Sequence, residues 1–314
     1  MKDYYKTECE RVIREFRKFD FSFALAADSH LDNSLCDTLE NIKAVDERLN
    51  FDCLVHLGDF LNGNFPKGYT EMLLNEQIEL WRASVNAVFY PVEGNHDGYC
   101  EGSVNDMATD ELWYGATRYL DEAEGVHRPL GKPYFYVDIE DKKIRLVFIC
   151  SFYYEWKDGV FNKKYGISGE QVNWLKNEGF NAPKGWTVMV FSHDAPFIDY
   201  FSPISKENQR INGYDAFCAL TDNAEKNGFT VAAWFLGHEH GDFDGKINGI
   251  NFIMTTSETA YVPSLWDMVG NGVFPERNLG TVTEDAWDAV SIDLKERMIR
   301  LVRFGAGSDR EISY

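Results

Sequence analysis

The sequence predicts an α/β fold in which short buried strands alternate with amphipathic helices. Brief apolar runs recur along the chain, and segments with a helical spacing of apolar residues separate most of them. Of the 314 residues, 44% are hydrophobic and 15% are aromatic, which is ample material for a packed core. Because helices lie between consecutive strands, we expect much of the sheet to be parallel, with right-handed crossovers.

The first predicted element is a short amphipathic helix at residues 3–19, where Val12, Ile13 and Phe16 recur among charged residues. Five apolar runs then have the length of buried strands, at residues 21–27, 53–57, 87–92, 187–191 and 231–236. Helical segments are predicted between strands, at residues 36–49, 70–85, 168–178 and 207–226. These elements make up the predicted parallel part of the fold.

Further segments favour β-structure, at residues 134–139, 144–150, 245–254, 288–294 and 298–304. Residues 140–143 and 294–297 resemble hairpin turns within this set. We expect these strands to build a second sheet that packs on the first. The longest irregular segments are predicted loops at the rim of a site, near residues 98–133, 194–206 and 257–286.

The chain is long for one hydrophobic core, but it contains no linker rich in Pro, Gly or Ser and no internal repeat. We therefore expect a single domain over residues 1–314. Its parts would be an N-terminal helix at 1–20, a core that carries the polar motifs at 21–256, and a rim loop with C-terminal strands at 257–314.

Each of the five predicted strands ends at a polar motif. In chain order the motifs are Asp28-Ser29-His30, Gly58-Asp59, Gly94-Asn95-His96-Asp97, Ser192-His193-Asp194 and Gly237-His238-Glu239-His240. Open α/β sheets place ligands beyond the carboxyl ends of their strands, so these side chains should meet. Imidazole suits zinc, iron and manganese, and carboxylate and amide oxygens suit the harder of these ions. The set therefore predicts a site for two divalent metals that share one carboxylate.

In this order the motifs resemble those of the calcineurin-like metallophosphoesterase family, over residues 28–240. The resemblance implies a four-layer α-β-β-α sandwich with two mixed sheets, and a metal site at the carboxyl ends of the strands. It also implies an enzyme that hydrolyses phosphate esters with two divalent ions, for which manganese, iron and zinc are all suitable. Within the family, the chain looks more similar to the branches that act on small molecules and phosphodiesters, including bacterial and phage-encoded ones.

The resemblance further implies a role for each motif residue. One metal would be held by Asp28, His30 and His240, the other by Asn95, His193 and His238, and Asp59 would bridge the two. A hydroxide shared by the two ions would attack phosphorus in line with the ester oxygen. His96 matches the family's catalytic histidine, which is not a ligand and can protonate the leaving oxygen.

Three more residues are candidates for contacts with the substrate or with the ligands: Asn62, Asp97 and His127. Asn62 stands where the family's protein phosphatases have an aspartate that supports the catalytic histidine, and an amide can still accept a hydrogen bond. Asp97 replaces the glutamate of those phosphatases. His127 lies in a predicted loop, so it is either an ordinary loop residue or reaches the substrate from the rim. His56 lies within an apolar strand, where it is expected to pack in the core or to support a ligand and not to bind metal itself.

The charge balance narrows the choice of substrate. With 31 basic and 51 acidic residues the formal charge is -20, which opposes attraction to a polymeric nucleic acid. Two bound dications would make the site itself positive, so a small phosphodiester or phosphomonoester is expected. Two alternatives are a metal-dependent nuclease and an inactive scaffold that serves as a binding or structural component, as in a phage or membrane-associated assembly. All seven ligand positions and His96 carry competent residue types, which speaks against the inactive scaffold.

The cellular setting is predicted from simpler signals. The six cysteines are scattered without a C-x-x-C pair, which favours reduced thiols in the cytoplasm. The charged N-terminus lacks the apolar centre of a secretory signal, and no apolar run approaches the roughly 20 residues that span a membrane. We expect a cytoplasmic protein without a membrane span, and the sequence predicts no oligomeric state.

Overall fold

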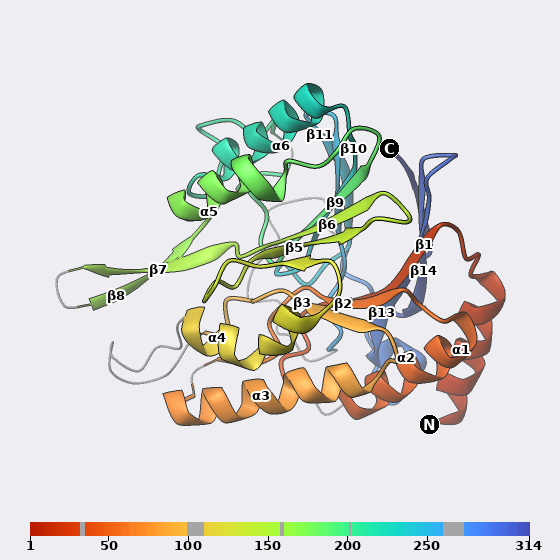
Figure 1. Ribbon diagram of the computed structural model, residues 1–314. Coiled ribbons are helices and arrows are strands. Elements are labelled where there is room, and N and C mark those ends of the chain that lie inside the picture. Colours follow the sequence, from red (N-terminus) through yellow and green to blue (C-terminus); the bar gives the residue numbers. More distant parts are fainter. Residues whose placement is uncertain (32–34, 64, 99–109, 158–159, 201, 260–272) are drawn as a thin grey trace.

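The computed structural model describes residues 1–31, 35–63, 65–98, 110–157, 160–200, 202–259 and 273–314. In this part of the chain two β-sheets pack face to face, and helices cover their outer faces (Figure 1). Both sheets contain parallel and antiparallel strand pairs. The four-layer α-β-β-α sandwich with two mixed sheets is therefore confirmed.

The first sheet has the strand order β15-β14-β13-β1-β2-β3. Its strands are β1 (Phe21–Ala26), β2 (Cys53–His56), β3 (Val88–Pro91), β13 (Ala286–Asp293), β14 (Met298–Gly305) and β15 (Arg310–Ser313). β1, β2 and β3 are parallel, and the C-terminal strands extend the sheet in antiparallel pairs beyond β1. Its outer face is covered by α1 (Asp3–Glu15), α2 (Leu35–Leu49) and α3 (Lys67–Ala83) (Figure 1).

The second sheet has the strand order β11-β12-β10-β9-β6-β5-β4. Its strands are β4 (Val126–His127), β5 (Phe135–Ile139), β6 (Ile144–Ile149), β9 (Thr187–Ser192), β10 (Thr230–Leu236), β11 (Phe243–Ile247) and β12 (Ile250–Met254). β6, β9, β10 and β12 are parallel to one another. Its outer face is covered by α5 (Gly169–Trp174), the helical turns at Leu175–Gly179, and α6 (Gly213–Asn227).

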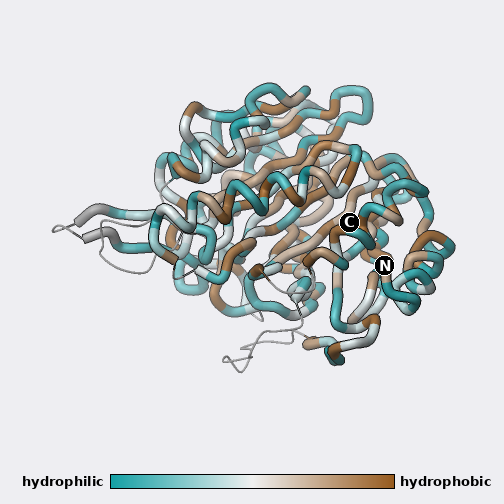
Figure 2. Tube along the Cα trace, turned by 90° about the horizontal axis from the view of Figure 1, so that it is seen from below, coloured by the Kyte–Doolittle hydropathy of each residue, from teal (hydrophilic) through white to brown (hydrophobic). Residues whose placement is uncertain are grey.

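The main core lies between the two sheets. Phe23 of β1, Phe191 of β9 and Phe235 of β10 pack there, with ring centroids 5.0 to 5.8 Å apart. β1 and β6 are buried along their whole length, as expected for strands that are covered on both faces. Figure 2 shows the hydrophobic strands running through the interior, with hydrophilic segments on the surrounding helices.

The strands that end at polar motifs are divided between the sheets, with β1, β2 and β3 in the first and β9 and β10 in the second. The segments expected to build a separate second sheet are divided as well. β13 and β14 join the first sheet, whereas β5, β6, β11 and β12 join the second. That expectation was wrong because β13 pairs with the edge of β1, whose backbone groups would otherwise lack partners on that side.

Several segments without predicted structure contain regular elements. α4 (Asp110–Ala116), a 3-10 helix at Arg118–Glu122 and β4 lie within the predicted loop at 98–133. A second 3-10 helix, at Val282–Glu284, lies near the end of the predicted loop at 257–286. Cys100 and the central part of that second loop lie outside the described residues.

A β-hairpin that the sequence did not indicate projects from the body of the molecule in Figure 1. It consists of β7 (Phe152–Lys157) and β8 (Val160–Tyr165), which pair with each other in a separate two-stranded sheet. Among the helices of the described residues, none combines the length and the apolar character needed to cross a membrane.

Candidate metal centre

The seven predicted ligands follow five strands of the two sheets and lie at the carboxyl ends of these strands. In chain order they are Asp28 and His30 after β1, Asp59 after β2, Asn95 after β3, His193 after β9, and His238 and His240 after β10. The structure brings all seven together. The reason is that parallel strands of one sheet end at the same edge, which is where such sheets bind ligands.

The first cluster contains Asp28, His30, Asp59 and His240. One potential ligand atom of each residue lies within 4.8 Å of the others. His240 Nε2 is 3.3 Å from Asp28 Oδ1 and 3.2 Å from His30 Nε2. The two carboxylates are buried and the two imidazoles are slightly exposed. The cluster thus offers two oxygens and two nitrogens to one cation.

Asp59 also belongs to a second cluster, with His193 and His238. His193 Nε2 lies 3.3 Å from Asp59 Oδ2 and 3.1 Å from His238 Nδ1. The amide oxygen of Asn95 is 3.0 Å from the same His193 nitrogen. Because Asp59 takes part in both clusters, its carboxylate occupies the position from which one residue can bridge two cations.

Both clusters have the chemistry of cation sites. The Nδ1 atom of His30 is 3.0 Å from the carbonyl oxygen of Leu61, and the Nδ1 atom of His193 is 2.8 Å from that of Leu57. We assign the proton to Nδ1 in both rings, so each Nε2 lone pair points into its cluster. The buried Oδ1 atom of Asp28 has no hydrogen-bond partner among the described residues. Acceptors gathered so closely, with few donors between them, fit two divalent ions.

The protonation states of two ligands, Asp28 and His238, suit cation binding. Burial alone would raise the pKa of Asp28, but the nearby imidazoles of His240 and His193 outweigh it and lower this pKa to about 2. Burial lowers the pKa of His238 to about 3. Near neutral pH, Asp28 is therefore ionised and His238 is neutral, and these are the forms that coordinate metals. At His193, the carboxylate of Asp59 outweighs burial and raises the pKa to about 10, so a bound cation would have to displace a proton there.

The backbone beside the ligands is packed too closely for larger residues. A Cβ atom on Gly94 would lie 2.0 Å from the backbone nitrogen of Asp59 and 2.2 Å from its Oδ1 atom. A Cβ atom on Gly58, whose φ is 99°, would lie 2.6 Å from the backbone nitrogen of Gly94. Glycine at these two positions therefore lets the motifs after β2 and β3 touch.

Five of the seven predicted ligands have a left-handed backbone conformation. Their φ angles lie between 48° and 73°, at Asp28, His30, Asp59, His238 and His240. This conformation is uncommon for residues with a side chain and costs on the order of 1–3 kcal/mol each. Strain of this kind is typical of functional sites, where it persists because the surrounding structure enforces it.

Asp97 joins the two central motifs through the backbone. Its buried carboxylate accepts hydrogen bonds from four backbone N–H groups, those of Asp59, Phe60, Leu61 and Gly94, at 2.7 to 3.0 Å. Three of these donors belong to the turn after β2 and one to the turn after β3. Asp97 therefore fixes the position of Asp59 relative to the turn after β3.

His96 lies beside the ligand clusters without belonging to either. Its Nδ1 atom is 2.8 Å from the backbone carbonyl oxygen of Asn62, and its Nε2 atom is 3.9 Å from Asp59 Oδ2. The His96 side chain is 40% exposed, so its Nε2 atom remains accessible to a bound molecule. The side-chain amide of Asn62 was expected to support His96. The backbone carbonyl group of Asn62 makes this contact instead, and its side chain is exposed.

A third group of potential ligands, Asp194, His238 and Glu239, adjoins the second cluster. Arg210 lies against it, with its Nε atom 2.9 Å from Asp194 Oδ2. A guanidinium at this distance already compensates the buried carboxylate, so the group needs no cation of its own. The contact with Arg210 also explains how Asp194, which directly follows the predicted ligand His193, can be buried.

The β7–β8 hairpin adds two side chains beside the second cluster. Lys163 Nζ donates a hydrogen bond to the backbone carbonyl oxygen of Asn95 at 3.2 Å. The ring centroid of Tyr165 is 6.0 Å from that of His238, and Lys163 Nζ is 5.2 Å from the Tyr165 ring. Sequence reasoning missed both residues because no motif marks them. The available signal was the strand-like alternation that places positions 163 and 165 on one face.

Two other histidines take structural positions. His127 lies on β4, with its ring stacked on Tyr136 at 4.6 Å, and no described contact joins it to the predicted ligands. This position agrees with the first of its two alternatives, an ordinary structural residue, and contact with a substrate from the rim stays a prediction. His56 is buried between Phe60 and Trp81, at centroid distances of 3.9 and 4.5 Å, as expected for a packed residue.

The two-sheet sandwich and its paired cation clusters define a metal-dependent enzyme site at the strand ends. A family model described as calcineurin-like phosphoesterase matches residues 21–242, which is more than two thirds of the chain. The chain therefore belongs to the calcineurin-like phosphoesterase family, and it is a metallophosphoesterase. Membership implies the binding of two divalent ions, and the clusters provide candidate ligands for both.

Comparison with the curated proteins finds no significant match. Among solved structures, a dimetal phosphatase from Danio rerio is similar over 95% of this chain and 100% of its own length, with 14% sequence identity and a TM-score of 0.59. GAP50, the anchor in the inner membrane complex of Plasmodium, is similar over 90% of this chain and 84% of its own, with 12% identity and a TM-score of 0.48. The first likeness shows a shared fold, and the second is too distant to add to it.

Proposed function

We propose that the protein hydrolyses a small phosphodiester or phosphomonoester with two divalent ions of manganese, iron or zinc. The observation that carries this proposal is the position of Asp59, whose carboxylate belongs to both ligand clusters. Two ions that shared the Asp59 carboxylate as a ligand would be able to act on the same phosphoryl group. Family membership supports the reaction class, and the mixed oxygen and nitrogen ligands accept all three metals.

The proposed assignment gives each ion four protein ligands. One ion is held by Asp28, His30, Asp59 and His240, and the other by Asp59, Asn95, His193 and His238. When bound, the ions neutralise charge on the phosphoryl oxygens and lower the pKa of the attacking water. The chain itself orients two of these ligands, His30 and His193, through the backbone carbonyl groups of Leu61 and Leu57.

His96 is proposed to act on the leaving group. Its Nδ1 atom is occupied by the Asn62 carbonyl oxygen, so its exposed Nε2 atom is the one that can face a substrate. A histidine in this position can hydrogen-bond to the leaving oxygen and donate a proton as the ester bond breaks. The residue stays outside the coordination shell in this proposal, which separates proton transfer from metal binding.

The proposed substrate is small and not a polymeric nucleic acid. The net charge of -20 opposes the general attraction that nucleic-acid enzymes gain from clustered Lys and Arg residues. Near the second cluster, Lys163 and Tyr165 provide a cation and a ring for a compact substrate. An inactive scaffold is disfavoured because seven ligand candidates with metal-binding chemistry converge on one point.

The decisive experiment assays the wild-type protein, loaded in turn with manganese, iron and zinc. The panel contains phosphomonoesters, cyclic nucleotides, glycerophosphodiesters, an aryl phosphodiester and single-stranded DNA. Asp59→Asn should abolish hydrolysis because the shared ligand loses its charge. Asp141→Asn makes the same chemical change at an exposed turn residue and should leave hydrolysis unchanged. A fully metal-loaded wild-type protein that cleaves no member of the panel would overturn the proposal.

A further inference from the structure

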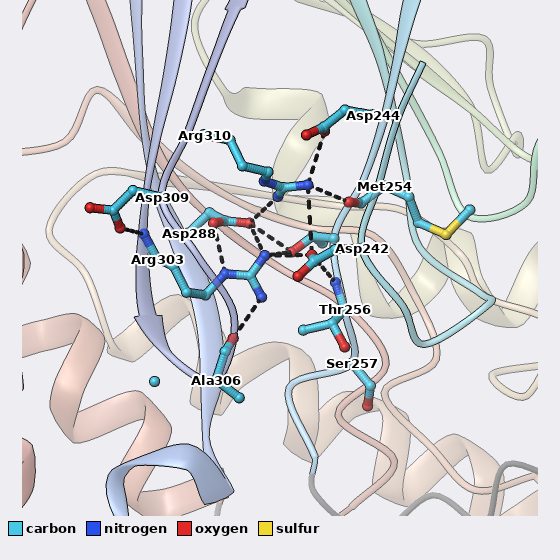
Figure 3. A network of polar contacts seen from close by, with 12 residues as sticks. Asp242, Asp244, Met254, Thr256, Ser257, Asp288, Arg303, Ala306, Asp309 and Arg310 are labelled. Carbon is cyan, nitrogen blue, oxygen red and sulfur yellow. Dashed lines mark hydrogen bonds and ion pairs between the residues drawn. The ribbon is translucent and has the colours of Figure 1, made fainter. Parts of the chain in front are cut away.

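A buried ion network connects the C-terminal strands to the loop that carries His240 (Figure 3). Its central residue is Arg303 of β14, whose side chain is 1% exposed. Arg303 Nε donates to Asp288 Oδ1 at 2.9 Å, and its Nη2 atom donates to Asp242 Oδ1 at 2.6 Å. Asp288 belongs to the first sheet, whereas Asp242 follows β10 of the second. One guanidinium thus links the two sheets close to the metal centre.

Hydrogen bonds through Thr256 connect Asp242 to the backbone of His240. The same Asp242 Oδ1 atom accepts a hydrogen bond from the backbone N–H of Thr256 at 3.1 Å. The Thr256 hydroxyl donates to the carbonyl oxygen of His240 at 2.8 Å. Since the φ of His240 is 58°, its position depends on contacts that hold a strained backbone in place.

Ser257, which follows Thr256, contacts the backbone at Asp28, another residue of the first cluster. The Ser257 hydroxyl donates to the carbonyl oxygen of Asp28 at 2.9 Å. The backbone N–H of Glu258 donates to the carbonyl oxygen of Ala27, beside Asp28, at 2.8 Å. The segment 255–258 therefore contacts the backbone at Asp28 and at His240, both of which belong to the first cluster only.

The second cluster is held by other contacts. His193 is fixed through the carbonyl group of Leu57, and Lys163 contacts the backbone at Asn95. Neither contact involves Arg303, Asp242 or the segment 255–258. One hydrogen bond joins the two halves of the centre, from the backbone N–H of His238 to Asp28 Oδ2 at 3.0 Å. The other supporting contacts named above come from separate parts of the molecule.

A second arginine makes the network rigid. Arg310 of β15 donates to Asp288 Oδ2 at 2.9 Å, to Asp244 Oδ1 at 3.1 Å and to the carbonyl oxygen of Met254 at 2.8 Å. Thr255 also donates to Asp288, at 2.7 Å. A buried network in which each charge has several partners is held in one arrangement. Its atoms are therefore suited to fix a neighbouring segment and not to bind a further ligand.

We propose that Arg303, through Asp242 and Thr256, is a positioning residue for the half of the metal centre formed by Asp28, His30 and His240. Loosening this network should weaken the binding of one of the two ions and leave the other unchanged. The inference rests on the proposed function because it requires that the two clusters bind metal. Contacts behind metal ligands typically change metal affinity by about 10- to 100-fold.

The sharpest test is Thr256→Val, which removes the hydroxyl bonded to His240 and keeps the shape of the side chain and the N–H bonded to Asp242. Equilibrium dialysis with Mn²⁺, together with electron paramagnetic resonance of the bound ions, measures both sites without any substrate. We expect one Mn²⁺ to bind at least about 10-fold more weakly, with the second unchanged and the signal of a coupled pair lost at limiting metal.

Asp242→Asn and Arg303→Lys extend the test to the rest of the network, and both should weaken the same site. Two matched controls are Thr221→Val, which removes a helix hydroxyl in α6, and Arg300→Met, on the same strand as Arg303 but paired with Glu311. Both controls should bind two ions with wild-type affinity. Should Arg303→Lys fail to fold, Thr256→Val and Asp242→Asn still decide the question.

A double variant identifies the weakened site. Thr256→Val should cause no further loss in a His30→Ala background, where the first site is already impaired, but should remove the remaining tight site in a His238→Ala background. Wild-type affinity at both sites in Thr256→Val and Asp242→Asn, or equal weakening of both sites, would overturn the inference. If the wild-type protein binds no metal, the proposed function fails instead.

Discussion

The Nε2 atoms of His30 and His240 lie 3.2 Å apart, although the Nδ1 atom of His30 is already bonded to the Leu61 carbonyl group. With the proton on Nδ1, the Nε2 lone pair of His30 points at the His240 ring, close to the carboxylate of Asp28. Two imidazoles and a buried carboxylate in this arrangement attract a cation. We therefore expect the folded state to bind metal ions more tightly than the unfolded chain does.

Metal removal should accordingly destabilise the fold. At a free Mn²⁺ concentration 100 times the dissociation constant, each site adds about 2.7 kcal/mol to the free energy of unfolding. Thermal unfolding measured with Mn²⁺ and with a chelator should show a clear rise in Tm with the metal. The difference should shrink strongly in Asp59→Asn, which loses the shared ligand. Equal Tm values for wild-type protein with and without metal would contradict this account.

Replacing His96 should separate catalysis from metal binding. We expect His96→Ala to lower kcat by a factor of about 10² to 10⁴, the range for loss of a general acid, with metal content unchanged. Asn62→Ala is the matched control, because Asn62 contacts His96 only through its backbone carbonyl group. It should leave kcat near the wild-type value. A large loss in Asn62→Ala would show that the side-chain amide matters after all.

A methyl group at Gly94 should disrupt the shared ligand. The added Cβ atom would approach the backbone nitrogen of Asp59 to 2.0 Å, so Asp59 must move. Gly94→Ala should therefore lose bound metal and activity, as measured by metal analysis and hydrolysis of an aryl phosphodiester. Gly68→Ala makes the same change in α3, where nothing lies within 4 Å of the added atom. That variant should keep full metal content, and a Gly94→Ala protein with two bound ions would contradict the close-packing argument.

The ligand candidates could be predicted from the sequence because each is local to its own strand. Asp28 follows β1 and Asp59 follows β2, so strand periodicity and chain order suffice to place them at one sheet edge. The division of the strands between the two sheets was harder to predict from the sequence. The pairing of β13 with β1 joins residues about 270 positions apart, and no local pattern specifies such a partner.

Contacts made by main-chain groups also could not be predicted from the sequence. Asn62 was a candidate for its side chain, yet its carbonyl group makes the contact to His96. Every residue has such a carbonyl group, so residue type carries no signal for this role. The approach of Lys163 to Asn95 depends on how the β7–β8 hairpin projects, which is likewise set by the tertiary structure.

The β7–β8 hairpin yields a prediction about substrate binding. Lys163 lies beside Asn95 and on the same face of β8 as Tyr165, so its ammonium group is placed to contact an anionic substrate at the second cluster. We expect Lys163→Met to raise KM about 10-fold, the effect of one charged contact, with a smaller change in kcat. Steady-state kinetics on the best substrate of the panel measures both.

The adjacent residue provides the control for this prediction. Lys164 points to the opposite face of the strand and lies 3.8 Å from Glu155, with about a third of its side chain exposed. Lys164→Met should leave both constants unchanged. Equal effects of the two substitutions would indicate that the overall charge of the hairpin matters and not the position of Lys163.

The ion pair between Asp288 and Arg303 should make stability depend on pH. Burial would raise the pKa of Asp288, but Arg303 and Arg310 outweigh it and hold this pKa below its ordinary value. In the unfolded chain the pKa of an aspartate is about 3.9. Because the folded value is the lower one, the ion pair stabilises the fold above about pH 4, and this stabilisation is lost as the pH falls through the folded pKa.

Arg303→Met tests the direction of this pH dependence, because it leaves the buried carboxylate of Asp288 without its main partner. We expect the metal-free variant to be less stable than metal-free wild type by about 3–5 kcal/mol at pH 7, measured by urea unfolding. The difference should shrink as the pH falls through the folded-state pKa of Asp288, first in the variant, where loss of Arg303 raises that pKa, and then in the wild type, where protonation breaks the ion pair. Arg300→Met breaks a partly exposed pair on the same strand and should cost at most about 1 kcal/mol. A stability difference between Arg303→Met and wild type that stays constant from pH 7 to the acid limit of folding would show that lost packing, and not the charge of Asp288, accounts for the role of Arg303.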